Sequence, residues 1–384
     1  MHPCFSPEQQ PSPQTLAGQL AGLTAAEVER SLSKPRLEAE DLLALLSSAA
    51  EPFLETMARQ AQALTRRRFG RVMKLYAPLY VSNECTNACV YCGFNRSHDI
   101  RRRTLSLGEV EAQAGFLADQ GFQNLLLVSG ESRKSVPVEY LRQCLLRLGP
   151  RFPELSLEVY PLEAEEYRSL AEAGLYGLAL YQETYQPEVY AAVHPSGEKR
   201  DFRKRLLAPQ LAAAAGLRQV SLGALLGLAD FRLDAYYLGL HARSLQKQYW
   251  RTNVALSFPR LRPATGGYAP PQPVSDRQFV QLVAALRLFL PDAPFSLSTR
   301  EPESLRDHLL GLGFTQMSAG SCTEPGGYPA ISAGVGERPA AAQFTVEDRR
   351  SAADIAAGLE RLGFEPVWKD WDAGFAAAAT GAEA

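Results

Sequence analysis

The chain has 384 residues, of which 46% are hydrophobic, and its formal net charge at pH 7 is −2. A chain of this size can bury a large core, in one extended domain or in two. The near-neutral charge gives no overall basic surface for nucleic acid, and no stretch of about 18 apolar residues is present that could span a membrane. The proline-rich start lacks the apolar segment of a signal peptide, so we expect a cytoplasmic protein.

The first 70 residues predict a helical N-terminal extension. Residues 1–14 are polar and proline-rich, and we expect them to be disordered. From about Thr15 to Phe69 the pattern is helical, because Met57, Ala61 and Leu64 fall at helical spacing and Gly70 is a suitable stop. The arginine runs 66–68 and 101–103 are short, and we expect both to lie on solvated faces.

Residues 71–330 alternate short apolar runs with amphipathic helical stretches. The predicted strands are Leu75–Val81, Asn124–Ser129, Ser156–Val159, Gly177–Tyr181, Gln219–Leu225, Asn253–Phe258, Pro294–Ser298 and Thr315–Ser318. The predicted helices between them include Leu107–Gln120, Glu163–Ala173, Leu206–Ala215, Asp234–Tyr249 and Ser275–Leu290. Eight β/α units over about 250 residues indicate an α/β fold of the (β/α)8 TIM-barrel type. A doubly wound open sheet is the alternative. Residues 331–384 predict a small C-terminal extension, with a helix near Ala353–Leu362 and an aromatic end.

Three of the six cysteines lie close together, immediately after the first predicted strand. Cys85, Cys89 and Cys92 are separated by three and then two residues. Such a tripod can bind three irons of a [4Fe–4S] cluster and leave the fourth without a protein ligand. A structural zinc site is an alternative, but zinc needs a fourth ligand and the nearest histidine is His98. A disulfide is a further alternative, although nothing else in the chain indicates secretion.

The cysteine motif, with the aromatic Tyr91 before its last cysteine, resembles that of the radical S-adenosylmethionine (radical SAM) enzymes. The resemblance implies that SAM binds the open iron and is cleaved to methionine and a 5′-deoxyadenosyl radical. Barrel enzymes build their sites at the carboxyl ends of the strands. The three cysteines follow the first predicted strand, and other candidate residues follow the second, fourth and seventh strands.

The same resemblance assigns SAM contacts to further residues of the chain. Ser129, Gly130 and Glu131 match the motif that binds the SAM amino group, although serine stands where the family often has glycine. Glu183 matches the acid that holds the ribose hydroxyls; a helix-capping glutamate is the alternative. Arg205 resembles the arginine that pairs with the SAM carboxylate, with Arg203 as a nearby rival. Tyr91 and the apolar segment 223–228 would pack near the adenine.

Within the radical SAM enzymes, the chain most resembles the tyrosine lyases of bacterial thiamine-thiazole biosynthesis, the 2-iminoacetate synthases. The resemblance covers residues 64–372 and is carried by Tyr76–Asn83, Tyr181–Tyr185, Ser257–Pro263, Leu297–Glu301, Pro325–Tyr328 and Trp368–Asp372. It implies cleavage of the Cα–Cβ bond of L-tyrosine to 2-iminoacetate and 4-methylphenol. It also implies transfer of the imine to a thiazole synthase, and a reductase or flavodoxin-type electron donor.

A lyase of this kind must hold the carboxylate and the amine of tyrosine beside the radical. Arg300, after the seventh predicted strand, is the candidate for the carboxylate because its fork of donors fixes orientation. The alternative for Arg300 is an ion pair with Glu301 or Glu303. Ser318, at the end of the eighth strand, is a second candidate contact. His194 lies in a loop near the barrel mouth, and we expect a solvent-facing or capping role or a link to substrate.

Other functions remain open at this point. The hydrogenase-maturation tyrosine lyases carry a second cysteine cluster on a C-terminal extension, whereas the last cysteine here is Cys322. We interpret Cys322, Cys4 and Cys144 as small apolar fillers. A tryptophan lyase of the same branch is a further rival. A non-catalytic zinc-binding scaffold is the hypothesis from a different class.

Overall fold

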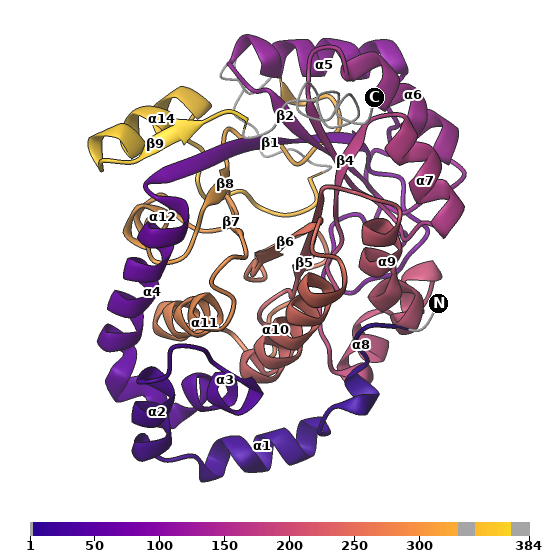
Figure 1. Ribbon diagram of the computed structural model, residues 1–384. Coiled ribbons are helices and arrows are strands. Elements are labelled where there is room, and N and C mark those ends of the chain that lie inside the picture. The colour runs from indigo at the N-terminus through magenta and orange to yellow at the C-terminus, as the bar shows by residue number, and fades with distance from the viewer. Residues whose placement is uncertain (1–2, 329–341, 370–384) are drawn as a thin grey trace, which may run out of the picture.

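Eight parallel strands close into a barrel that is ringed by helices in the computed structural model, which describes residues 3–328 and 342–369 (Figure 1). The barrel strands are β1 (Val72–Ser82), β2 (Asn124–Ser129), β3 (Glu154–Glu158), β4 (Leu175–Ala179), β5 (Gln219–Gly223), β6 (Asn253–Ser257), β7 (Phe295–Leu297) and β8 (Gln316–Ser318). Each strand pairs with the next along the chain, and β1 pairs with both β2 and β8. The ring is therefore closed. The predicted barrel is confirmed, and the open doubly wound sheet is wrong.

The barrel strands alternate with helices, which cover the outside of the ring. These are α5 (Leu107–Asp119), α6 (Val138–Leu148), α7 (Ala164–Glu172), α8 (Pro187–Val193), α9 (Phe202–Ala214), α10 (Phe231–Gln248), α11 (Asp276–Phe289) and α12 (Glu303–Leu309). Local sequence sets several of their starts. The Ser106 hydroxyl accepts a hydrogen bond from the Glu109 N–H, and the Glu109 carboxylate accepts one from the Ser106 N–H, which is a capping box.

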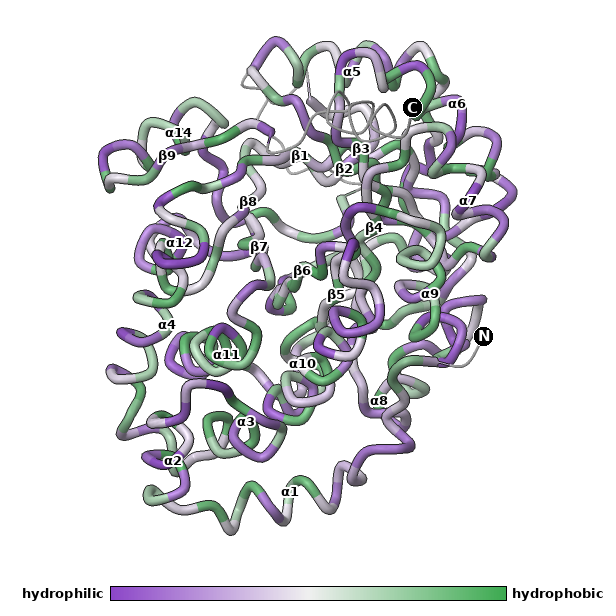
Figure 2. Tube along the Cα trace, viewed as in Figure 1, coloured by the Kyte–Doolittle hydropathy of each residue, from purple (hydrophilic) through white to green (hydrophobic). Residues whose placement is uncertain are grey.

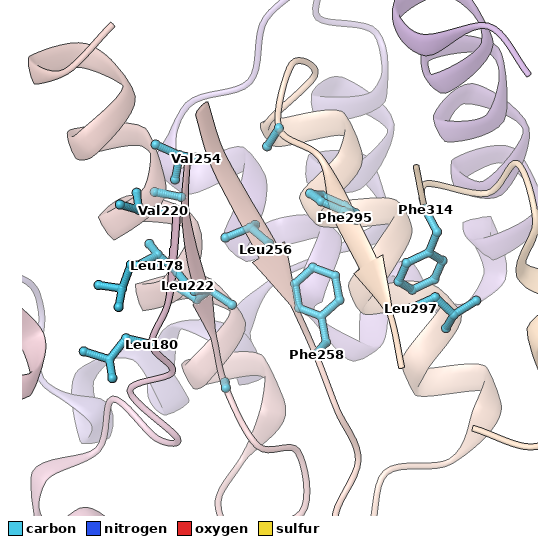
Figure 3. Close-up of a cluster of buried hydrophobic side chains, with 14 of the residues drawn as sticks. Leu178, Leu180, Val220, Leu222, Val254, Leu256, Phe258, Phe295, Leu297 and Phe314 are labelled. Atoms are coloured by element: carbon cyan, nitrogen blue, oxygen red, sulfur yellow. The ribbon is translucent and has the colours of Figure 1, made fainter. Parts of the chain in front are cut away.

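Apolar side chains on the outer face of the strands form the main core. Figure 3 shows Val220 and Leu222 of β5 beside Val254 and Leu256 of β6, all of them buried. Successive side chains of a strand point to opposite faces, so the residues between these apolar ones point toward the barrel axis. Along the surrounding helices, hydrophobic and hydrophilic stretches alternate, as expected for helices that bury one face (Figure 2).

The inside of the barrel is more polar than the branched apolar filling usual in this fold. A cavity there is lined by polar side chains, among them Lys74 and Tyr76 of β1, Glu154 and Ser156 of β3 and Ser221 of β5. Lys74 and Glu154 form an ion pair whose side chains are 8% and 2% exposed. Because charges this deeply buried are costly unless paired, the two residues depend on each other.

The N-terminal extension consists of α1 (Pro13–Gly22), α2 (Ala25–Leu32), α3 (Ala39–Leu46) and α4 (Leu54–Phe69), with short 3-10 helices at Pro7–Gln9 and Ser48–Phe53. Helix α4 packs on α11, and α3 packs on α10 and α11. The prediction that the first 14 residues are disordered is wrong for residues 3–14. Phe5 is buried and stacks on His241 with ring centroids 5.1 Å apart. Other contacts also hold the segment, since Pro7 is buried and the Pro11 carbonyl accepts a hydrogen bond from the Tyr237 hydroxyl at 2.7 Å. Contacts with such distant residues leave no signal in a polar, proline-rich pattern.

Two described elements of the C-terminal region, α14 (Ala352–Arg361) and β9 (Glu365–Val367), lie against the barrel. Strand β9 pairs in parallel with the start of β1. Asp348 and Arg306 of α12 form an ion pair in which both side chains are fully buried. Trp368 packs edge-on against Phe122, whereas residues 370–372 of the predicted aromatic end lie outside the described residues. The domain boundaries near 70 and 330 stay a prediction.

No helix within the described ranges is both long enough and apolar enough to cross a membrane.

The Arg306–Asp348 ion pair gives a stability prediction. Asp348→Ala leaves the buried guanidinium of Arg306 without its carboxylate, and we expect the free energy of unfolding to fall by about 3–5 kcal/mol. Chemical denaturation followed by circular dichroism measures the change. The control is Glu55→Ala, which breaks the exposed pair with Arg59 and should cost less than about 1 kcal/mol. Equal effects of the two substitutions would contradict the importance of burial.

Candidate active site

The three cysteines of the motif lie in the long loop after β1, at the carboxyl end of the barrel. Arg102 fastens this loop, because its guanidinium donates hydrogen bonds to the carbonyls of Asn83 and Phe94 at 2.7 and 2.9 Å, and to that of Asn95 at 2.6 Å. The predicted solvated face is therefore wrong for this arginine. Arg102 holds the backbone on both sides of the cysteines, so it fixes the loop in place.

All six cysteines are free thiols, and those of the motif lie in surroundings that suit a buried cluster. Burial raises the pKa of Cys85 and Cys89, and that of Cys92 to about 11. Iron must therefore displace their protons when it binds. In the described part of the chain no three His, Cys, Asp or Glu side chains meet closely enough to hold one metal ion. A cubic cluster places each thiolate on a different iron, so its ligands need not meet at one point.

The segment after β2 lies directly against the cysteine loop. A Cβ atom on Gly130 would come within 2.3 Å of the Glu84 carbonyl oxygen and 3.2 Å of Cys85 Cβ, so only glycine fits there. The backbone N–H of Thr86 donates to the Glu131 carbonyl at 3.0 Å. The Ser129 hydroxyl is buried, and no described group hydrogen-bonds to it. A close-packed glycine beside an unpaired polar atom fits the predicted contact with a small polar ligand such as the SAM amino group.

Glu131, Glu183, Arg205 and Lys199 form one buried ionic network. Arg205 Nη1 lies 2.8 Å from Glu131 Oε1, and Arg205 Nη2 lies 3.8 Å from Glu183 Oε1. Lys199 Nζ donates to Glu183 at 2.7 Å. Burial opposes ionisation of Glu183, but the charges of Lys199 and Arg205 outweigh it and lower its pKa. The fold thus brings together three predicted SAM residues: Glu131 after β2, Glu183 after β4 and Arg205 in α9. Arg203 instead pairs with Glu8 on the surface, at 79% exposure.

Glu183 has an unusual backbone conformation. Its φ of 68° makes it the one described non-glycine residue in the left-handed region, which costs on the order of 1 kcal/mol. The Leu225 N–H donates to its carbonyl at 2.8 Å, and its carboxylate is held by Lys199. Several contacts therefore fix a strained geometry of the kind that is common at ligand sites, and the predicted role of Glu183 stays a prediction.

Tyr91 packs against the apolar segment that, together with it, was expected to lie beside the adenine. Its ring contacts the apolar cluster that includes Leu225 and Leu228, from the segment 223–228. His194 Nδ1 lies 2.8 Å from the Tyr190 carbonyl, so this nitrogen carries the proton and Nε2 accepts from the Tyr91 hydroxyl at 2.8 Å. Burial lowers the pKa of His194 to about 3. His194 is therefore neutral and buried, not solvent-facing, and its contacts suit the positioning of Tyr91.

A pocket opens at the carboxyl ends of the strands and contains both predicted substrate residues, Arg300 and Ser318. The pocket is lined by Tyr76, Pro78, Tyr80, Leu126, Val128, Glu158, Tyr181, Ser257, Pro259, Ser298, Thr299, Arg300, Ser318, Ser321, Thr323 and Phe344. The Arg300 guanidinium stacks on the Phe344 ring, with Cζ 3.4 Å from the ring centroid. Ser318 Oγ accepts the Thr299 N–H at 3.1 Å, which ties the ends of β7 and β8 together.

The ion-pair alternative for Arg300 is not what the structure shows. Glu301 pairs with Arg260 and with Arg262, the latter at 2.9 Å. Glu303 lies 3.6 Å from Arg350. Among the residues that the structure describes, none offers a carboxylate within ion-pair distance of the Arg300 guanidinium. Arg300 is therefore available for an anion in the pocket.

Sequence reasoning did not find Lys199, Asn87 or Glu158. Lys199 lies in a short 3-10 helix, Glu198–Arg200, where no motif marks it. Asn87 stands inside the cysteine motif, and its amide donates to Glu131 Oε2 at 2.9 Å. Glu158 is the last residue of β3 and lines the pocket. The available signal was its position at a strand end, the same kind of position that had identified Arg300 and Ser318 as candidates.

The contact between Gly130 and the cysteine loop is testable. Gly130→Ala places a methyl group against backbone at Glu84, which cannot move away without displacing Cys85. We expect iron and acid-labile sulfide per chain, after anaerobic reconstitution, to fall several-fold. Gly18→Ala, a helical position with open space around it, should leave both unchanged. Full cluster content in the Gly130 variant would show that the loop does not need this close approach.

Two family models match the chain. Residues 79–231 match the Radical SAM superfamily, and residues 257–365 match the Biotin and Thiamin Synthesis associated domain. The chain is 44% identical over 352 residues to the 2-iminoacetate synthase of Escherichia coli, covering 91% of this chain and 92% of that protein. It is 43% identical to the 2-iminoacetate synthase of Salmonella typhimurium, with the same coverage.

Solved structures agree with this placement. The FeFe-hydrogenase maturase HydG of Carboxydothermus hydrogenoformans is 32% identical, with a TM-score of 0.85, 93% of this chain covered and 83% of that one. Methylornithine synthase (PylB) is 21% identical, with a TM-score of 0.70 and 91% and 99% covered, and shares the fold. Because the chain is 44% and 43% identical to two 2-iminoacetate synthases over 91% of its length, it belongs to the 2-iminoacetate synthase family of the radical SAM superfamily.

Proposed function

We propose that this chain cleaves the Cα–Cβ bond of L-tyrosine, giving 2-iminoacetate and 4-methylphenol for thiamine-thiazole biosynthesis. The observation that carries the proposal is the 44% identity to 2-iminoacetate synthase across almost the whole of both chains. Membership of this family makes the chain a carbon–carbon lyase and sets aside the zinc scaffold. The hydrogenase-maturation lyases are a related branch, but the chain is only 32% identical to the maturase HydG, against 44% for the 2-iminoacetate synthase.

The cofactors are a [4Fe–4S] cluster and SAM, which when bound supply the 5′-deoxyadenosyl radical. We propose that Cys85, Cys89 and Cys92 hold the cluster. The unpaired Ser129 hydroxyl and the exclusion of any side chain at Gly130 support a SAM contact there. The ionic network of Glu131, Glu183 and Arg205 supports the remaining SAM assignments, since a zwitterion needs both signs of charge.

Arg300 and Ser318 are the proposed substrate contacts. A guanidinium that has no carboxylate partner among the described residues can hold the tyrosine carboxylate with two parallel hydrogen bonds. Arg260 and Arg262 act indirectly, because they occupy Glu301 and so prevent it from pairing with Arg300. The Ser318 hydroxyl lies in the same pocket and can donate to that carboxylate.

We also propose a thiazole synthase as the acceptor of the imine and a reductase or flavodoxin-type protein as the electron donor. Both follow from the family's reaction, which consumes an electron and releases a reactive imine. A reducing cytoplasm would suit the cluster's thiolate ligands.

The first test concerns the cluster. In an anaerobic assay with SAM, reductant and tyrosine, the wild type should form 4-methylphenol and 5′-deoxyadenosine, detected by mass spectrometry. Cys89→Ala removes one cluster ligand and should abolish both products. Cys144→Ala, which alters a buried cysteine outside the motif, should keep most of the activity. Unaffected turnover by the Cys89 variant would reject the assignment. Offering tryptophan together with tyrosine shows which amino acid is cleaved.

The second test concerns Arg300. Arg300→Ala removes the proposed carboxylate partner, and we expect the Kd for tyrosine to rise by about 10- to 100-fold, as for a lost charged hydrogen bond. SAM cleavage without tyrosine should persist, because Arg300 is not among the proposed SAM contacts. Calorimetry measures the affinity. Arg203→Ala, at an exposed site, is the control, and normal tyrosine affinity in the Arg300 variant would contradict the role.

A further inference from the structure

Glu158 is an acidic residue inside the barrel mouth that the assignments above leave unused. It is the last residue of β3, where Ser156 and Glu158 alternate with the buried Leu155 and Leu157. Ser156 lines the deeper cavity of the barrel, and Glu158 lines the pocket above it. Its carboxylate has no hydrogen bond or ion pair with any residue of the described ranges. The half-buried carboxylate is therefore free to bind a ligand that enters the pocket.

The charges of the pocket match an amino acid. Among the lining residues, Glu158 is the one carboxylate and Arg300 the one guanidinium; the others are hydroxyl-bearing, aromatic or apolar. Free tyrosine at neutral pH carries one carboxylate and one ammonium group. Since Arg300 is the proposed partner of the carboxylate, the complementary partner of the ammonium is Glu158.

The surroundings of Glu158 place it between the SAM residues and the substrate residues. Glu183, beyond β4, repels its negative charge, while Arg300, Lys199 and Arg205 attract it. Three tyrosines line the same pocket: the half-buried Tyr76 and the buried Tyr80 of β1, and the half-buried Tyr181 after β4. Burial, reinforced by Glu183, raises the pKa of Glu158 to about 7. The group can therefore exchange a proton near neutral pH.

We propose that the Glu158 carboxylate binds the ammonium group of tyrosine and removes one proton from it. An N–H bond breaks, an O–H bond forms on Glu158, and ammonium plus carboxylate become neutral amine plus carboxylic acid, with no electron transferred. The neutral amine can then lose a hydrogen atom without leaving a positive charge beside Arg300. The inference rests on the proposed tyrosine lyase activity and assigns its base.

A binding experiment tests recognition without requiring turnover. Calorimetry compares tyrosine with 3-(4-hydroxyphenyl)propanoate, which lacks the amine, on cluster-loaded protein at pH 8. The wild type should prefer tyrosine by about tenfold or more, as expected for a charged hydrogen bond, whereas Glu158→Gln should lose most of that preference. Ser156→Ala, on the same face of β3 one layer deeper, should keep it. Equal preference in the wild type and the Gln variant would overturn the proposal.

A pH profile tests the proton transfer. The wild-type rate of 4-methylphenol formation should fall as the pH drops through about 7, because the carboxylate then becomes protonated. Glu158→Gln should be slower by about 10²–10⁴-fold, and its residual rate should rise with pH up to 9, as free tyrosine loses its own ammonium proton. A slow variant that keeps the wild-type profile would point to a structural role and overturn the proposal.

A conservative variant covers the case in which Glu158→Gln does not fold or load its cluster. Glu158→Asp keeps the carboxylate and should keep the loss of rate at low pH, at a lower maximum rate. Disappearance of that loss in the Asp variant would overturn the proposal. Failure of the underlying function looks different, because the wild type itself would then form no 4-methylphenol from tyrosine.

Discussion

The ion pair between Arg205 and Glu131 is the contact on which the barrel mouth depends. The two residues come from α9 and from the loop after β2, and their side chains are 5% and 11% exposed. Charges buried to this degree require partners, so helix α9 and the loop after β2 hold each other in place. Arg205 also approaches Glu183 after β4, while Asn87 ties Glu131 to the cysteine loop. The cofactor half of the site is thus held as one network.

The network requires a closed ring, and the ring in turn tolerates a polar interior. Apolar side chains of the strands, some of them drawn in Figure 3, form the main core together with apolar side chains of the helices. The inward positions are then free to carry polar groups, from the Lys74–Glu154 pair at the base to Glu158 and Arg300 at the mouth. The burial of polar groups is costly unless each finds a partner. The pair at the base is satisfied internally, whereas Glu158 and Arg300 have no charged partner among the described residues.

Sequence patterns predicted the barrel and the cysteine loop because both leave local signals. The predicted bounds of strand β2 are the observed ones, Asn124–Ser129. The candidate residues were found because they follow strand ends, where barrel enzymes build their sites. The features that the sequence did not reveal depend on contacts between distant parts of the chain. Lys199 matters because the fold brings it to Glu183, and Phe5 is held by residues far along the chain, Tyr185 and His241. Arg102 appeared to be one of three solvated arginines, yet it binds carbonyls that only the folded loop presents.

The two matched family models divide the barrel along chemical lines. The model of residues 79–231 contains the cysteines and the proposed SAM residues, and that of residues 257–365 contains Arg300 and Ser318. Glu158 belongs to the first region and lines the pocket that also contains Arg300 and Ser318 of the second. A substrate bound to Arg300 also meets side chains of the first region, among them Tyr80 and Tyr181, but among the lining residues only Glu158 offers it a carboxylate. This carboxylate carries the charge opposite to that of Arg300, so the two can orient an amino acid between them.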